Sequence, residues 1–190
     1  MSTNAELKKI VNEFYTLYED TARTTRTAAM ANLPAGAAAP AESVIYGEAG
    51  RNTFAKEAAK LLARAEQLIN AKITPIKARV TASPSEDAVN AVTMLSLNKG
   101  ISETDVDLLL EKYADNYQTV KALKSVAVEK GLDKYRSITK DPDIVELEEL
   151  ESLKTNLAKS LNISAAENHH GSHATAKWLL EMAIDRVIAD

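Results

Sequence analysis

The 190-residue sequence contains no cysteine. This absence excludes disulfide bonds, iron–sulfur clusters, zinc sites with thiolate ligands and cysteine nucleophiles. Glycine and proline are scarce, at six and five residues, and the aromatic residues are two Phe, one Trp and six Tyr. Because Ala, Leu, Glu and Lys are abundant while turn-forming residues are few, the composition favours helices over strands.

Long apolar runs are also missing. The first residues, MSTNAELKK, contain no apolar run behind a basic head, so we expect no signal peptide. No apolar run approaches the ~20 residues that a membrane-spanning helix needs. We therefore expect a cytoplasmic protein that has no membrane partner.

Helical periodicity is the strongest signal present. No segment alternates apolar and polar residues over the length of a strand with turn residues on both sides. The sequence predicts an all-α fold, a bundle of six to eight helices. The apolar positions of the main predicted helices are Leu7, Ile10, Val11, Phe14, Leu17 and Tyr18; Phe54, Leu61, Leu68, Ile69, Ile73, Ile76 and Val80; Ala88, Val89, Val92, Met94 and Leu95; Val106, Leu109, Leu110 and Leu123; Ile144, Leu147, Leu150, Leu157 and Leu161; and Trp178, Leu179, Met182, Ile184, Val187 and Ile188.

Helix boundaries are marked by capping residues, whose side-chain oxygens accept hydrogen bonds from the first free amides. The predicted N-caps are Thr3, Ser83, Ser102 and Asp141, and a break is expected at the ADNY sequence of residues 114–117. Pro75 lies inside the apolar pattern of residues 52–82. It has no amide hydrogen, so we expect it to kink this long helix.

The segment NLPAGAAAPAESV offers little to bury and is typical of a tether. We therefore expect an N-terminal helical arm at residues 1–30, an Ala/Pro/Gly-rich linker at 31–50 and a helical bundle domain at 51–190. Phe14, Leu17 and Tyr18 on the arm would be costly to leave in water. They are predicted to pack either on the chain's own bundle or on a partner.

All three histidines lie in AENHHGSHATAKW, residues 166–178. On a helix His169 and His173 would share a face and could chelate a metal, with Glu167 nearby. Alternatively, Ser172 caps the last helix and the histidines lie in the polar turn before it. No HExxH motif or glycine-rich phosphate loop is present. We therefore expect no cofactor and favour a non-enzymatic protein, with a metal-dependent enzyme as an alternative.

Charge is unevenly distributed although the net charge is only −4. Residues 51–80 contain seven Lys or Arg against two Glu, whereas residues 141–151 contain six acidic residues and no basic one. These segments are either two solvated faces or surfaces that meet within the fold or between copies. Lys56, Lys60 and Arg64 form a basic ridge that suggests a DNA-associated regulator as another alternative. The acidic helix after residue 102 argues against it, because it would repel phosphate.

The sequence YADNYQTVKALKSVAVEKGLDKY, residues 113–135, resembles helical segments of uncharacterised phage and prophage proteins over about one eighth of the chain. The resemblance implies a structural, scaffold-like or accessory role and no catalytic residue. Together with the broad apolar faces, it favours a helical interaction or assembly protein. Its expected partner is itself, as a homo-oligomer, or another protein.

Overall fold

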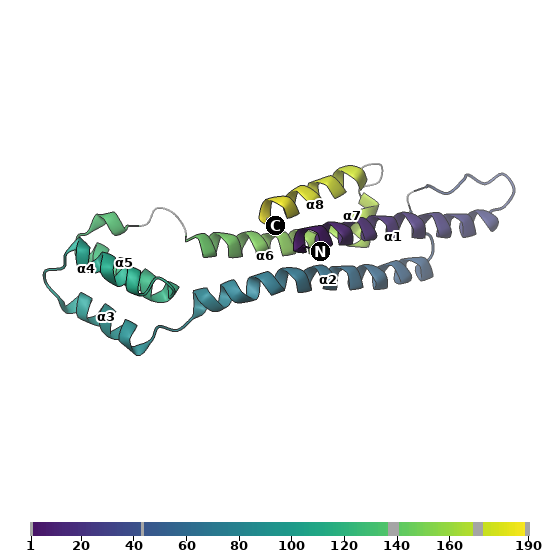
Figure 1. Ribbon diagram of the computed structural model, residues 1–190. Helices are drawn as coiled ribbons and strands as arrows, with labels where there is room; N and C mark the ends of the chain where they lie inside the picture. The colour runs from purple at the N-terminus through teal and green to yellow at the C-terminus, as the bar shows by residue number, and fades with distance from the viewer. Residues whose placement is uncertain (1, 43, 137–140, 169–172, 189–190) are drawn as a thin grey trace. The chain divides into compact units, whose positions relative to one another are not determined.

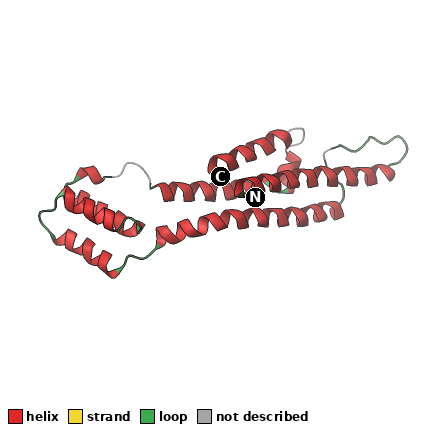
Figure 2. Ribbon diagram, in the orientation of Figure 1, coloured by secondary structure: helices red, strands yellow, loops and turns green. Residues whose placement is uncertain are grey.

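The computed structural model describes residues 2–42, 44–136, 141–168 and 173–188 (Figure 1). These residues form helices and loops and contain no strand, which confirms the all-α prediction (Figure 2). The elements are α1 (Thr3–Ala31), α2 (Glu48–Thr81), α3 (Glu86–Leu97), α4 (Glu103–Lys112), α5 (Tyr117–Glu129), the 3-10 helix η1 (Asp133–Tyr135), α6 (Pro142–Ser160), α7 (Ile163–Asn168) and α8 (His173–Val187). None of the described helices has the length and apolar character needed to cross a membrane.

The chain forms two compact units. Unit 1 comprises Met1–Ala71 together with Glu149–Asp190, and unit 2 comprises Lys72–Glu148. This division differs from the predicted arm, linker and bundle, because α1 belongs to unit 1 and the helices α2 and α6 each contribute to both units.

Unit 1 is organised around α1. The apolar stripe predicted for this helix is buried, and α1 packs against α8 and α7. Phe14 and Tyr18 contact Phe54 of α2 edge to face, with ring centroids 5.5 and 5.4 Å apart. These contacts remove large aromatic surfaces from water, so the N-terminal helix is part of the unit 1 core rather than a free arm.

Polar contacts tie the start of α1 to the end of α8. The Asn4 side-chain amide donates to the backbone carbonyl of Ile188 at 2.8 Å and to Asp185 at 3.0 Å. Lys8 forms an ion pair with the same aspartate. Lys8, and then Asn4, hold the pKa of the Asp185 carboxyl below its usual range because both stabilise its charged form.

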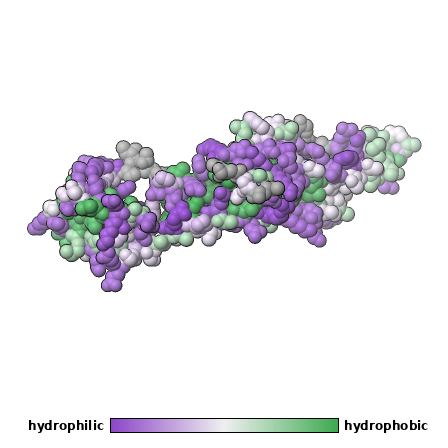
Figure 3. Space-filling view, in the orientation of Figure 1, coloured by the Kyte–Doolittle hydropathy of each residue, from purple (hydrophilic) through white to green (hydrophobic). Residues whose placement is uncertain are grey.

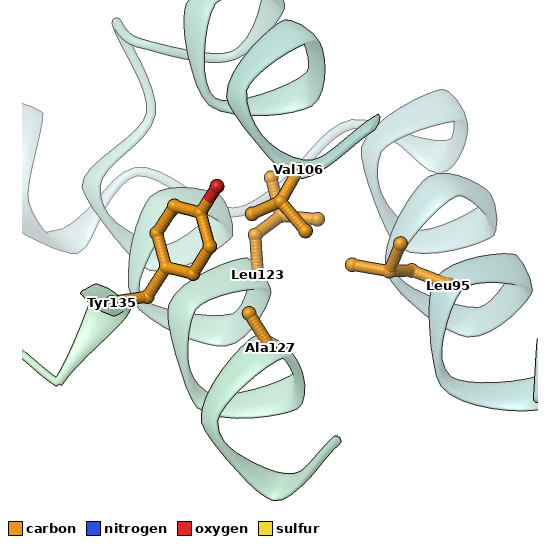
Figure 4. Packing of buried hydrophobic residues seen from close by; sticks show 5 residues of the cluster. All are labelled: Leu95, Val106, Leu123, Ala127 and Tyr135. Atoms are coloured by element: carbon orange, nitrogen blue, oxygen red, sulfur yellow. The ribbon is translucent and has the colours of Figure 1, made fainter. Parts of the chain in front are cut away.

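Unit 2 has its own apolar core. Leu95, Val106, Leu123, Ala127 and Tyr135 converge from α3, α4, α5 and η1 (Figure 4). The Tyr135 hydroxyl reaches the edge of this core, within 2.8 Å of both the Glu103 carbonyl and the Asp107 carboxylate. Its polar end is therefore satisfied while its ring stays buried.

Two predicted caps are confirmed, and two are displaced. Ser102 and Asp105 form a reciprocal capping box, and the Asp141 carboxylate accepts a hydrogen bond from the Asp143 amide at 2.9 Å. The first helix is capped by Ser2 rather than Thr3, and α3 by Ser85 rather than Ser83. Each actual cap places its hydroxyl 3.2 Å from the amide three residues on, which is the contact that fixes a helix start.

The predicted break within residues 103–130 is also present. Asn116 caps α5 by accepting a hydrogen bond from the Thr119 amide at 2.9 Å. Its side-chain amide donates to the carbonyls of Ala82 and Ser83, each at 3.3 Å. The break therefore fixes the α2–α3 loop as well as starting a helix. The helix α2 continues through Pro75, in agreement with the apolar spacing on both sides of this residue. The kink expected at Pro75 stays a prediction.

Candidate protein-interaction surface

The outer side of the α3–α4 pair in unit 2 exposes large apolar side chains. Met94 is 69% exposed, Leu97 72% and Leu108 61%, and Val89 is half exposed. In the space-filling view, hydrophobic atoms reach the surface among hydrophilic ones around these helices (Figure 3). Folding of unit 2 alone therefore leaves several large apolar side chains in water, and clustering of such residues is typical of a binding surface.

These side chains stay exposed because the two helices carry more apolar residues than one face can hold. In α3 only Ala88 and Leu95 are buried. In α4 the run Leu108-Leu109-Leu110 spans most of a helical circumference, so at least one leucine must leave the core. This run is the signal in the sequence that could have identified the surface. The helical spacing instead predicts a buried face that includes Val89 and Met94, and for these two side chains that prediction is wrong.

A groove of about 490 Å³ lies within this apolar area. It is lined by Ala91, Met94, Leu95, Leu97, Asn98 and Leu109. Asp87, one helical turn before Ala91, accepts hydrogen bonds from Lys112 at 2.8 Å and from the Tyr113 hydroxyl at 2.6 Å, and so ties α3 to α4. Lys112 first, and then Tyr113, lower the pKa of the Asp87 carboxyl, because both stabilise its charged form.

The segment that forms this surface is acidic. Residues 83–115 contain seven acidic residues against Lys99 and Lys112. Lys134 neutralises two of them, Glu103 and Asp107, at 2.9 and 3.0 Å. Of the seven acidic residues, Glu86, Asp105, Glu111 and Asp115 have no cationic partner among the described residues. The apolar α3–α4 surface is therefore set in a negative field.

A second exposed apolar face corrects the prediction for the last helix. Trp178, Leu179 and Met182 were predicted to be buried, yet each is about half exposed on α8. The buried residues of α8 are Ala176, Leu180 and Ile184, and Ile188 directly after the helix continues this spacing of four; Ile184 and Ile188 are among the predicted apolar positions. The exposed residues and the buried residues of α8 each follow a helical period. Packing against α1 determines which of the two sets is buried.

The predicted basic ridge is partly neutralised by neighbouring carboxylates. Arg64 pairs with Glu6 at 2.6 Å and with Glu13 at 2.9 Å, both on α1. Lys60 pairs with Glu57 at 2.7 Å. Of the three predicted DNA contacts, Lys56 is the one with no ion pair in the part of the chain described. The ridge therefore offers little uncompensated positive charge to a phosphate backbone.

The predicted metal pair of His169 and His173 can be described only at His173, because His169 lies outside the described residues. His173 is mostly buried, and its ring contacts Tyr15 and Tyr18 with centroids 5.3 and 5.2 Å apart. One ring nitrogen lies 3.0 Å from the Ala166 carbonyl and the other 3.5 Å from Glu19. The described residues contain no group of three side chains that could hold a metal ion.

Glu167, the third ligand considered for that site, is paired elsewhere. Its carboxylate lies 2.7 Å from the Arg51 guanidinium. Burial raises the pKa of Tyr18 to about 12, and the charge of Glu167 adds to this shift while Arg51 opposes it. The described side chains around His173 therefore form a packed junction between α1, α2, α7 and α8, and the metal site predicted from His169 and His173 stays a prediction.

The arm residues predicted to pack either on the chain's own bundle or on a partner lie within unit 1. Phe14 and Tyr18 are fully buried, and Leu17 is half-buried. Contact with a partner through the two aromatic side chains would require α1 to leave its own core. Leu150 and Leu157, two apolar positions of the helix predicted within residues 144–161, are also buried. The exposed apolar faces instead lie on α3, α4 and α8.

No family model, curated protein or solved structure matches this chain. Its function must therefore be inferred from the exposure, contacts and charges of its own residues. The phage-like role expected from residues 113–135 stays a prediction.

Proposed function

We propose that this chain is a non-enzymatic helical interaction protein, and that unit 2 binds an amphipathic, Lys/Arg-rich helix of a partner protein. The observation that carries the proposal is the apolar α3–α4 groove, which is formed by a segment, residues 83–115, with four carboxylates that have no cationic partner among the described residues. A helix that lays its apolar face into a groove is a recurrent mode of recognition. Basic residues beside that face would meet the acidic surroundings of the groove.

The apolar part of the surface supplies the driving force. Complete burial of a Leu or Met side chain is worth about 1.5–3 kcal/mol, so covering the exposed parts of Met94 and Leu97, which line the groove, would contribute about 1–2 kcal/mol each. A few such side chains are enough to dominate a helix–groove contact.

The charges add selectivity. A basic helix is attracted to Glu86, Asp105, Glu111 and Asp115, whereas a nucleic-acid backbone and a second acidic surface are repelled. The same charges disfavour pairing of this surface with its own copy, because two negative faces would meet. A basic partner is therefore favoured over a homo-oligomer at this site.

Fluorescence anisotropy with a labelled 20-residue model helix tests the proposal. The helix carries Leu at helical spacing on one face and Lys elsewhere, and its counterpart carries Glu in place of Lys. We expect saturable binding of the Leu/Lys helix that weakens by about tenfold or more in a Met94→Ser/Leu97→Ser variant. The Leu/Glu helix is expected to bind far more weakly.

A Leu179→Ser/Met182→Ser variant is the matched control, because it removes similar exposed side chains from α8. It should bind the Leu/Lys helix like the unmodified chain. Equal binding by all three proteins, or equal binding of both helices, would refute the proposal. Light scattering tests the alternative that a second copy of the chain covers this surface. A mass that rises with concentration and returns to the monomer value in Met94→Ser/Leu97→Ser would assign the surface to a second copy instead.

A further inference from the structure

Unit 2 contains a second hollow that the proposed function does not use. It has a volume of about 500 Å³, within the range of small-molecule sites. Its walls come from α5, from the end of η1 and the residue after it, and from the start of α6, and all of them belong to unit 2. The lining residues are Tyr117, Val120, Lys121, Lys124, Ser125, Val128, Glu129, Tyr135, Arg136, Asp141 and Pro142. We call this hollow the α5 pocket.

Two lysines in the α5 pocket have no counter-charge. Lys121 and Lys124 lie three residues apart on α5, and neither forms an ion pair within the described ranges. Like charges at this spacing repel each other weakly on a helix. A bound anion would relieve that repulsion while accepting hydrogen bonds from both ammonium groups.

Two carboxylates, Glu129 and Asp141, also line the α5 pocket, but neither forms an ion pair with Lys121 or Lys124. Asp141 accepts a hydrogen bond from the Asp143 amide as the cap of α6. Glu129 is the last residue of α5, one and a half turns from Lys124. Arg136 adds a third cation beside the lysines, although it shares its charge with Asp133 at 3.0 Å.

The rest of the lining is suited to an apolar body. Val120, Val128 and Pro142 provide aliphatic surface, and Tyr117 provides an aromatic ring. Tyr135 offers only a small exposed edge of its ring, because the residue is buried in the unit 2 core and its hydroxyl contacts the Glu103 carbonyl and the Asp107 carboxylate. A few placed charges within apolar walls are the usual composition of a small-molecule site.

We propose that the α5 pocket binds a small amphipathic organic anion, with a carboxylate, sulfonate or phosphate head held between Lys121 and Lys124. Its aromatic or branched aliphatic body lies against Val120, Val128 and the tyrosine rings. This proposal is independent of the helix-binding surface, which uses the α3–α4 groove.

The test compares two probes that share an apolar body and differ in charge: 8-anilinonaphthalene-1-sulfonate and neutral N-phenyl-1-naphthylamine. Binding to the full chain is followed by fluorescence, and the site is located from NMR shifts of the amides of Tyr117–Glu129. We expect one saturable site for the sulfonate with shifts along α5. In Lys121→Gln/Lys124→Gln the affinity should fall by about tenfold or more, since each lysine supplies a charge-assisted hydrogen bond.

The control variant is Lys99→Gln/Lys130→Gln, which removes the same charge from exposed positions outside the lining of the α5 pocket. It should bind the sulfonate like the unmodified chain. Circular dichroism of both variants is the control that checks that each keeps its helical content. The proposal is overturned if the unmodified chain has no saturable site along α5, if both variants bind equally, or if the neutral probe binds α5 as tightly as the sulfonate.

Discussion

Replacement of Leu123 by alanine should destabilise unit 2 severely. Leu123 is fully buried and lies at the centre of the unit 2 core, where it packs among Leu95, Val106, Ala127 and Tyr135 (Figure 4). These neighbours come from four elements, so no single movement closes the space left by the lost side chain. The substitution therefore removes the transfer free energy of the missing carbons and also creates a cavity.

The expected cost is about 3 kcal/mol, within the ~2–5 kcal/mol found for buried Leu→Ala changes. Domains are typically stable by about 0.05–0.15 kcal/mol per residue, which for Lys72–Glu148 gives about 4–12 kcal/mol. The loss is thus a large fraction of the stability of unit 2. Amide hydrogen exchange along Thr119–Ala127 should accelerate by about a hundredfold, because every 1.4 kcal/mol corresponds to a factor of ten.

Leu108→Ala is the matched control, because the same chemical change is made in the same unit at a side chain that is 61% exposed. Its cost should stay below about 0.5 kcal/mol. If Leu123→Ala accelerated exchange less than about fivefold, or if the two variants were equal, the described packing of unit 2 would be wrong.

Three further predictions concern helix starts, the proline of α2 and acid stability. Ser85→Ala should cost about 1 kcal/mol in urea unfolding, whereas Ser83→Ala, at the cap predicted from sequence, should be neutral; the reverse order would contradict the observed start of α3. Pro75→Ala should raise the melting temperature, because an alanine amide can donate within α2 where proline cannot; a lower melting temperature would show that the helix depends on the proline. Lys134 and Tyr135 lower the folded-state pKa of Asp107, so its contribution is present above the unfolded pKa of ~3.9 and is lost as the pH falls through the folded value. Urea midpoints at pH 7 and pH 3 should therefore differ less in Asp107→Asn than in the unmodified chain, and an unchanged difference would contradict this role.

The class of the fold and several helix boundaries could be predicted from local chemistry. Ser102 with Asp105, Asp141 with Pro142 and the break near Asn116 each depend on contacts within a few residues, which the sequence contains in full. The caps at Ser2 and Ser85 were missed by one and two residues, because neighbouring hydroxyls offered equally good patterns.

The buried faces and the two units could not be predicted in the same way. In α8 the sequence KWLLEMAI places apolar residues on two sides, and only contact with α1 decides that Leu180 is buried while Trp178 is exposed. The division at Ala71 interrupts neither the helical pattern nor the composition, because α2 continues through it. The Leu108-Leu109-Leu110 run indicates that α4 exposes a leucine, but which apolar residues of α3 and α4 stay exposed is decided only in the assembled unit.

The order of the two units along the chain has a consequence for synthesis. Unit 2 is contiguous, so all of its residues are synthesised before Glu149. Unit 1 is split, and contacts such as that between Asn4 and Ile188 join residues 184 positions apart. The apolar stripe of α1 is therefore synthesised long before α8, against which it packs, and this interval is when a nascent chain would depend most on chaperones.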